Sequence, residues 1–159
     1  MIKINTAFID PLSEKAKASQ RKRINYNFHP QADDLLQRML HGMEPDTYVR
    51  PHKHENPDKV EAFFCLRGSV AVVEFDSEGT IIDHIVLDTT TGNYGCEIPP
   101  RTWHSIICIE PDSVVYEVKN GPYIPIEDKD FASWAPEEGD EKAVDFVNQI
   151  VEKLHLKKV

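Results

Sequence analysis

The 159-residue sequence contains no long apolar run. Its longest uninterrupted apolar stretch covers only residues 62–66, whereas a membrane-spanning helix needs roughly 20 apolar residues. The first residues also lack the apolar core of a secretory signal peptide. We therefore expect a cytoplasmic protein that does not interact with the membrane.

Positive charge is also scarce, because 18 Lys and Arg residues face 27 Asp and Glu residues, for a formal net charge of −9. A nucleic-acid binder needs a basic surface that displaces counterions, so no nucleic-acid partner is expected. The acidity is concentrated in residues 127–141, which contain seven acids and one base, while all six arginines lie between residues 21 and 101. A pocket built from the arginine-containing part can be locally basic, which favours an anionic substrate.

Cysteine is limited to Cys65, Cys96 and Cys108, an odd number without a C-x-x-C motif. Each lies in an apolar stretch, which is typical of reduced, buried thiols in a reducing compartment. We interpret Cys65 and Cys108 as small core residues rather than metal ligands.

Residues 38–120 have the pattern of short strands separated by turns. Clusters of Gly, Pro, Asn and Asp, which turns require, interrupt the apolar stretches. About eight strands in roughly 80 residues predict a mainly β protein, an antiparallel sandwich or small barrel. The expected strands cover residues 38–43, 47–54, 61–66, 70–75, 81–87, 95–98, 104–108 and 114–119.

Helices are expected only near the two ends of one domain, residues 1–159. The N-terminal arm, residues 1–37, is expected to begin with a helix over 10–20 that has Pro11 at its first position. A polar connector over 21–30, which starts as a solvated helix end, and a helical turn over 33–37 are expected to follow. An irregular acidic segment over 121–139 follows the barrel, residues 38–120. Residues 140–159 contain an amphipathic helix whose apolar face needs either the barrel or a second copy in a homodimer as its partner: Val144, Val147, Ile150, Val151 and Leu154.

Three histidines and one glutamate have the spacing of a metal site. Side chains two apart on a strand point to the same side, about 6–7 Å apart, so His52 and His54 can bind one ion. Glu61 and His104, on later strands, complete a set of three nitrogens and one oxygen that suits a catalytic divalent metal. We expect one ion per chain, with Zn, Fe, Mn and Ni all open. The other histidines fit no ligand pattern and are interpreted as structural or surface residues: His29, His41, His84 and His155.

The same strand alternation predicts the surroundings of this ion. Tyr48 and Arg50 share a face with the H-x-H pair and are expected at the pocket mouth, while Glu117 and Lys119 either line the cavity or form a cross-strand pair. Candidates for binding a substrate phosphate or carboxylate are Arg38, Arg50 and Lys119, with Tyr26 as a further substrate-binding residue. Candidates for moving protons are Tyr26, Tyr48, Glu117 and Tyr123.

These residues resemble the two motifs of the cupin superfamily. Residues 52–68 match G-x5-H-x-H-x3–4-E-x6-G from its first His onward, with six residues between the second His and the Glu. Residues 99–104 match G-x5-P-x-G-x2-H-x3-N, with Arg101 in place of its second Gly and Cys108 in place of Asn. The resemblance implies a cupin (double-stranded β-helix, jelly-roll) barrel that binds a metal, here with an N-terminal helical arm and a C-terminal amphipathic helix.

The chain resembles the WbuC-type cupin fold metalloproteins more closely, over nearly its whole length. The resemblance rests on residues 23–29, 37–39, 47–52, 117–123 and 130–136. It implies a bacterial, cytoplasmic metal-binding cupin, often encoded with surface-polysaccharide (O-antigen) biosynthesis, and it leaves the reaction open.

Three functions remain open from the sequence. The first is a metal-dependent enzyme acting on a small anionic or sugar-type substrate, such as a sugar phosphate, with isomerase or epimerase chemistry. The second is a non-catalytic cupin that binds a sugar or another small molecule. The third is an Fe(II)-dependent dioxygenase, since the ligand set leaves positions for O₂ and substrate.

Overall fold

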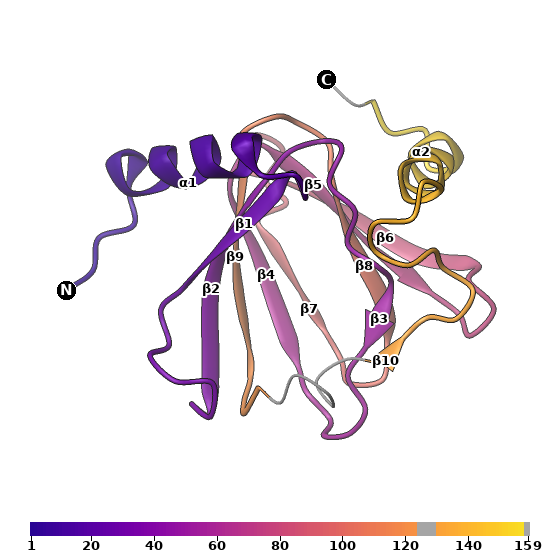
Figure 1. The fold of residues 1–159 in the computed structure, drawn as a ribbon, viewed down its shortest axis with the longest axis horizontal. Coiled ribbons are helices and arrows are strands. Elements are labelled where there is room, and N and C mark those ends of the chain that lie inside the picture. Colours follow the sequence, from indigo (N-terminus) through magenta and orange to yellow (C-terminus); the bar gives the residue numbers. More distant parts are fainter. Residues whose placement is uncertain (124–129, 158–159) are drawn as a thin grey trace.

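The computed structural model describes residues 1–123 and 130–157 (Figure 1). Two helices and ten strands lie within these residues. In chain order they are α1 (Thr6–Ala18), β1 (Arg23–Asn27), β2 (Leu36–Met43), β3 (His52–Lys53), β4 (Glu61–Arg67), β5 (Ser69–Phe75), β6 (Ile81–Asp88), β7 (Gly95–Ile98), β8 (Trp103–Cys108), β9 (Ser113–Asn120), β10 (Asp130–Phe131) and α2 (Ala143–Lys153).

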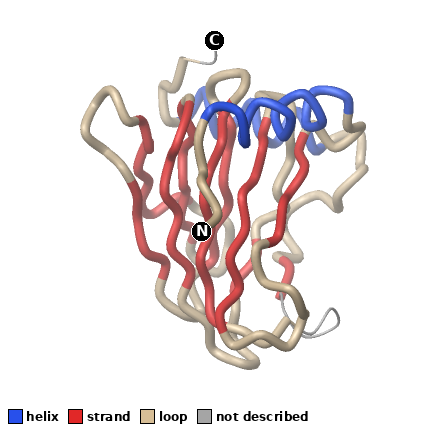
Figure 2. Tube along the Cα trace, turned by 90° about the vertical axis from the view of Figure 1, so that its left-hand side faces the viewer, coloured by secondary structure: helices blue, strands red, loops and turns tan. Residues whose placement is uncertain are grey.

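The strands form two five-stranded sheets, in the orders β1-β2-β9-β4-β7 and β10-β3-β8-β5-β6. Every pairing between named strands is antiparallel. Side chains from both sheets fill the space between them, among them Phe63 of β4, Val72 of β5 and Val115 of β9. Both helices lie toward the same end of the sheets (Figure 2). Antiparallel sheets packed face to face confirm the predicted mainly β architecture.

The N-terminal helix packs on the outer face of the first sheet and begins earlier than predicted. Asn5 caps α1 by accepting a hydrogen bond from the Phe8 N–H at 3.2 Å, which satisfies one of the donors that a helix start leaves open. Pro11 therefore lies inside the helix rather than at its first position. Ile9 and Leu12 are buried against residues of β2 and β9.

Residues 21–37 contain a strand that the sequence analysis did not predict. β1 pairs with β2, with Arg23 opposite Met43, and its apolar residues alternate with polar ones. Tyr26 packs against Phe8 of α1, with ring centroids 5.1 Å apart. The expected helical turn over 33–37 is also wrong, because β2 already begins at Leu36.

The expected strand over residues 47–54 shortens to β3. Other partners bind the backbone carbonyls before it, so they are not available for a strand ladder. Arg23 Nη1 donates to the Tyr48 carbonyl at 2.5 Å, and Ser105 Oγ donates to that of Val49 at 2.6 Å.

The C-terminal helix packs on the outer face of the second sheet. Ala143, Val147 and Ile150 of α2 are buried in one cluster with side chains of β5 and β8, whereas Val144, which we expected on the same face, is 45% exposed. The chain's own sheet therefore covers the apolar stripe, and homodimer formation stays a prediction. Among the described residues, no helix has both the length and the apolar character that a membrane crossing needs.

The acidic segment after β9 is only partly irregular. It contains the short strand β10, which pairs with β3 so that Phe131 lies opposite His52. Glu127, Asp128 and Lys129 of the expected acidic stretch lie outside the described residues.

We predict that the contact between α2 and the second sheet contributes strongly to stability. Ile150→Ala should lower the free energy of unfolding by about 2–5 kcal/mol, because it leaves a cavity in a buried apolar cluster. The exposed neighbour Gln149 on the same helix provides the control, and Gln149→Ala should change stability by less than about 0.5 kcal/mol. Urea denaturation of the two variants measures both values, and equal losses would contradict the packing described here.

Candidate functional site

The structure brings together the four residues predicted as metal ligands. His52 lies on β3, opposite His104 on β8, while Glu61 begins β4 and His54 directly follows β3. One potential ligand atom from each residue lies within 4.8 Å of the other three. All four residues are at most 3% exposed. The group combines three imidazoles with one carboxylate, as expected, and the structure leaves the identity of a metal open.

Backbone carbonyls orient two of these imidazole rings. His52 Nδ1 lies 3.0 Å from the Arg50 carbonyl oxygen, and His104 Nδ1 lies 2.9 Å from that of Thr102. A carbonyl only accepts, so Nδ1 carries the proton in both rings. The neutral rings then present the lone pair of Nε2, which is the arrangement that outer contacts impose on metal-binding histidines.

Glu61 lies at the centre of the group, 2.9 Å from His54 Nε2 and 2.8 Å from His104 Nε2. Burial raises the pKa of Glu61, but the hydrogen bonds from His104 and His54 and the charge of Lys119 outweigh it and hold that pKa well below its usual range. Because His104 Nδ1 already carries a proton, His104 can donate to Glu61 through Nε2 only as an imidazolium ion, whereas the neutral ring presents a lone pair to the carboxylate oxygen. A cation between the two atoms removes this repulsion, so the donor set fits a divalent metal ion.

The loop after β7 joins the two cupin-like motifs. The Arg101 N–H donates to the His54 carbonyl at 2.9 Å. Arg101 has a φ of +66°, a left-handed conformation that explains why the motif has Gly at this position. The Arg101 guanidinium binds Asp58, with Nε 2.9 Å from Oδ1, so it does not reach the ligand group.

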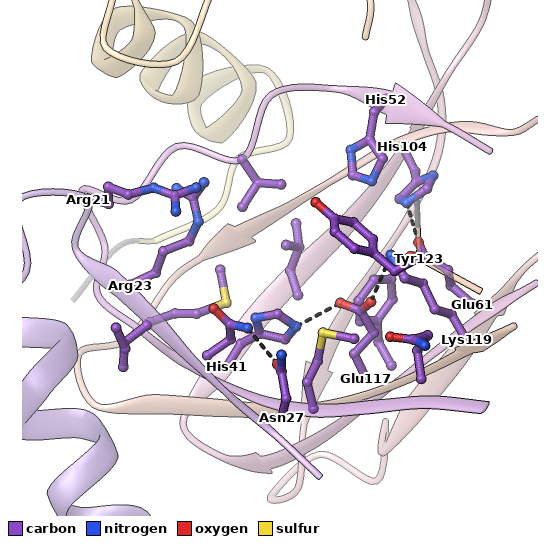
Figure 3. Close-up of a pocket in the computed structure, with 18 of the residues that line it drawn as sticks. Arg21, Arg23, Asn27, His41, His52, Glu61, His104, Glu117, Lys119 and Tyr123 are labelled. Carbon is purple, nitrogen blue, oxygen red and sulfur yellow. Dashed lines mark hydrogen bonds and ion pairs between the residues drawn. The ribbon is translucent and has the colours of Figure 1, made fainter. Parts of the chain in front are cut away.

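A cavity of about 420 Å³ includes three of the four predicted ligands in its wall. Figure 3 shows His52, His104 and Glu61 on one side of it, with Glu117 and His41 between them and Arg21 and Arg23. The walls come from both sheets and from the segments beside them: Ser19, Arg21, Arg23, Ile24, Asn25, Asn27, His29, Gln37, Met39, His41, Met43, Val49, His52, Glu61, Phe63, His104, Ile106, Glu117, Lys119 and Tyr123.

Charged side chains form a continuous row across this cavity wall. Lys119 Nζ lies 3.5 Å from Glu61 Oε1 and 3.7 Å from Glu117 Oε1. His41 Nε2 lies 2.7 Å from the other carboxylate oxygen of Glu117. Burial and the nearby Glu61 charge raise the pKa of Glu117, but His41 and Lys119 outweigh them and lower it. Glu117 is therefore a carboxylate at neutral pH.

Tyr48 and Arg50, expected at the pocket mouth, are absent from the cavity lining. The Tyr48 hydroxyl donates to the Pro136 carbonyl at 2.7 Å, and burial raises the pKa of Tyr48 to about 12. Arg50 donates to the Ala132 carbonyl at 3.0 Å. The expectation for both is corrected because strict strand alternation stops before β3, so that Val49 rather than Tyr48 lies on the cavity side with His52.

Arg38 and Tyr26 also lie away from the cavity. On β2, Met39 and His41 line the cavity, so alternation turns Arg38 to the other face, where it donates to the Phe28 carbonyl at 3.4 Å. Tyr26 forms an aromatic contact with Phe28, at a centroid distance of 5.1 Å. The structure does not place either of them in this cavity, and their role in substrate binding stays a prediction. Of the other candidates, three line the cavity: Glu117, Lys119 and Tyr123.

Several cavity residues were missed by the sequence analysis, among them His41, Arg21 and Arg23. His41 was interpreted as a structural or surface residue, and Arg21 and Arg23 as part of a solvated helix end. The alternation of side chains along a strand could have indicated His41 and Arg23. On β2, His41 points to the same side as Met39, and on β1, Arg23 points to the same side as Asn25; Met39 and Asn25 also line the cavity. For Arg21 no local pattern exists, since it lies before the first strand.

The chain belongs to the family described as "Domain of unknown function (DUF6016)", whose model matches residues 4–87, more than half of the chain. No curated protein matches the sequence.

Solved structures of low sequence identity share the fold. KdgF from Halomonas sp. is 19% identical, with 65% of this chain and 82% of that chain covered and a TM-score of 0.50. L-ribose isomerase from Acinetobacter sp. DL28, in complex with L-ribose, is 17% identical over 70% of each chain, with a TM-score of 0.53. The capsular polysaccharide assembling protein CapF from Staphylococcus aureus is 18% identical, with 67% of this chain but only 29% of CapF covered and a TM-score of 0.57.

At these identities the likeness shows the fold alone. Together with the two antiparallel sheets, it confirms the predicted jelly-roll fold.

We predict that the group of three histidines and Glu61 binds one divalent ion per chain. His104→Ala should weaken Zn²⁺ binding at least about 100-fold, since even outer-sphere changes cost 10–100-fold. His84, an exposed residue on β6, provides the matched control, and His84→Ala should keep the full metal content. Calorimetric titration with Zn²⁺ and elemental analysis measure both variants. Unchanged stoichiometry and affinity in His104→Ala would refute the site.

Metal affinity should also fall as the pH is lowered. The pKa of Glu61 is held well below its usual range, so its carboxylate stays charged, whereas the imidazoles must be neutral to bind a metal ion, so that protons compete with the ion as the pH falls. Between pH 7.5 and pH 5.5, Zn²⁺ affinity should drop by at least about tenfold. Titrations at the two pH values measure this, and an affinity that stays constant would contradict imidazole ligation.

Proposed function

We propose that this member of the DUF6016 family is a metal-dependent enzyme that acts on a small, anionic or sugar-type substrate by isomerase- or epimerase-like chemistry. One observation carries the proposal: the buried histidine and glutamate group and the Glu117–His41 pair face the same cavity. A volume of about 420 Å³ is within the range of small-molecule sites.

The metal ligands, Glu117 and His41 have separate roles in this proposal. A divalent ion held by the four ligands would polarise a hydroxyl or carbonyl oxygen of the substrate. Glu117 accepts a proton from a substrate carbon, and this is feasible because its lowered pKa keeps the carboxylate charged at neutral pH. His41, hydrogen-bonded to Glu117 at 2.7 Å, exchanges that proton with the cavity.

Lys119 and Tyr123 complete the polar wall. Lys119 lies between two carboxylates, those of Glu61 and Glu117, so its charge keeps them from repelling each other. Its ammonium lies 5.9 Å from the Tyr123 ring centroid. Tyr123 is 41% exposed, so it can contact a substrate that enters from solvent.

The biological setting of the proposal comes from the sequence resemblance. We propose a WbuC-type cupin in bacterial surface-polysaccharide metabolism that is cytoplasmic and forms a homodimer. One structural neighbour is named as a capsular polysaccharide assembling protein, which supports the first part. Cys65 and Cys96 are free thiols in the described part of the chain, which supports a reducing compartment.

Glu117→Gln should lower turnover by about 10²–10⁴-fold, the usual contribution of a general base, while metal content stays unchanged. The measurement is turnover of a panel of aldoses, ketoses and sugar phosphates by Mn²⁺-, Zn²⁺-, Ni²⁺- or Fe²⁺-loaded protein. The exposed Glu97 on the neighbouring strand β7 provides the control, and Glu97→Gln should keep full turnover.

Other outcomes of this panel identify the alternatives. Tight sugar binding without conversion would replace the enzyme by a non-catalytic binding cupin. Oxygen uptake by the Fe²⁺-loaded protein would indicate a dioxygenase instead. Full turnover by Glu117→Gln would refute the assigned proton acceptor.

A further inference from the structure

We propose that Arg21 and Arg23 form a binding site for a phosphate group at the edge of the cavity, and that Glu138 occupies this site in the free protein. The inference deepens the proposed function and rests on it for the identity of the cavity as a substrate site. It assigns the phosphorylated end of the substrate to residues that lie apart from the metal ligands.

The two guanidinium groups converge on one carboxylate. Arg23 Nη2 lies 2.9 Å from both oxygens of Glu138. Arg21 binds the same carboxylate with two nitrogens, Nε to Oε1 and Nη2 to Oε2, the latter at 3.0 Å. Paired, bidentate contacts of this kind are those that guanidinium makes to phosphate and carboxylate groups.

Arg23 is held in place by the protein itself. Its Nη1 donates to the Tyr48 carbonyl at 2.5 Å and lies 3.3 Å from Thr47 Oγ1. Thr47 Oγ1 in turn donates to the Arg21 carbonyl at 2.8 Å. The Arg23 side chain is only 14% exposed. A guanidinium that is already fixed loses little freedom when an anion binds, which favours affinity.

The position of the pair suits one end of a substrate. Arg21 and Arg23 line the same cavity as the metal ligands. Figure 3 shows them on the side away from His52 and His104. A sugar phosphate that spans the cavity can therefore place a carbohydrate oxygen at the metal group and its phosphate at the arginines.

The charge of the pair matches phosphate better than it matches Glu138. Two guanidinium charges face one carboxylate, which leaves one positive charge without compensation from Glu138. A phosphate monoester carries about −1.5 to −2 at pH 7, so it balances both arginines. Glu138 thus shows that the two arginines bind an anion, and it neutralises only one of their two positive charges.

Glu138 is placed so that a ligand can displace it. Its side chain is 40% exposed, so a ligand can reach the carboxylate and its two arginines from solvent. Gly139 follows with a φ of +92° and with no atom within 4 Å of its Cβ position, so the chain can turn here without a clash. The chain is fixed two residues before Glu138, where the Tyr48 hydroxyl donates to the Pro136 carbonyl.

The test compares the binding of inorganic phosphate to the metal-loaded full chain and its variants by calorimetry. Glu138→Gln removes the competing charge and should bind phosphate about tenfold more tightly than the wild type. Glu137→Gln, which removes the same charge from the adjacent, 83% exposed residue, should change the affinity less than about twofold. Adding Arg23→Gln to Glu138→Gln should abolish the gain.

Two results would overturn the proposal. One is an equal effect of Glu138→Gln and Glu137→Gln, which would reduce the contact to a structural ion pair. The other is a gain that persists without Arg23, which would place the phosphate elsewhere, including at the metal. Should Glu138→Gln fail to fold, the rise in melting temperature that phosphate gives the wild type must disappear in Arg21→Gln, and a rise of equal size would refute the site.

This experiment is independent of turnover. Phosphate binding that follows the pattern above, combined with no conversion of any sugar phosphate, would retain the arginine site and reject the proposed enzyme. Turnover of a sugar phosphate without the expected phosphate-binding pattern would retain the proposed enzyme and reject the arginine site.

Discussion

The buried carboxylate of Glu61 is the constraint on which the interior depends. A charge that is 2% exposed is costly unless hydrogen-bonding partners or opposite charges surround it. His54, His104 and Lys119 supply these partners from three different parts of the chain. The requirement therefore fixes how β4, β8 and β9 lie relative to one another at this end of the two sheets. It also creates a set of donors that suits a divalent cation.

This requirement extends along the cavity wall. Lys119 compensates Glu61, and Glu117 compensates Lys119 in turn. His41 Nε2 forms a hydrogen bond with the other carboxylate oxygen of Glu117. Each member lies on an inward-facing position of the first sheet, where an isolated charge would be unfavourable. The same row that makes these charges tolerable also connects the metal ligands to groups able to move a proton, so stability and the proposed chemistry depend on the same contacts.

The distribution of charge has a different meaning in three dimensions than along the sequence. The arginines, expected together around a pocket, mostly turn elsewhere: Arg38 and Arg50 bind backbone carbonyls, and Arg101 binds Asp58. The two that do line the cavity are bound by Glu138 of the acidic segment. The acidic and basic parts of the chain are therefore not separate regions, since one folds onto the other at the cavity edge.

Local pattern determined the short antiparallel strands, the amphipathic C-terminal helix and the four metal-ligand candidates, because alternation and motif spacing are properties of neighbouring residues. Only the tertiary structure decided which side chains share the cavity. Tyr48 could not be placed from the sequence, since distant groups such as Arg23 and Ser105 bind the carbonyls around it and break the alternation before His52. The roles of His41 and Glu138 likewise depend on partners more than 70 residues away in the chain, and such pairings exist only once the sheets have packed.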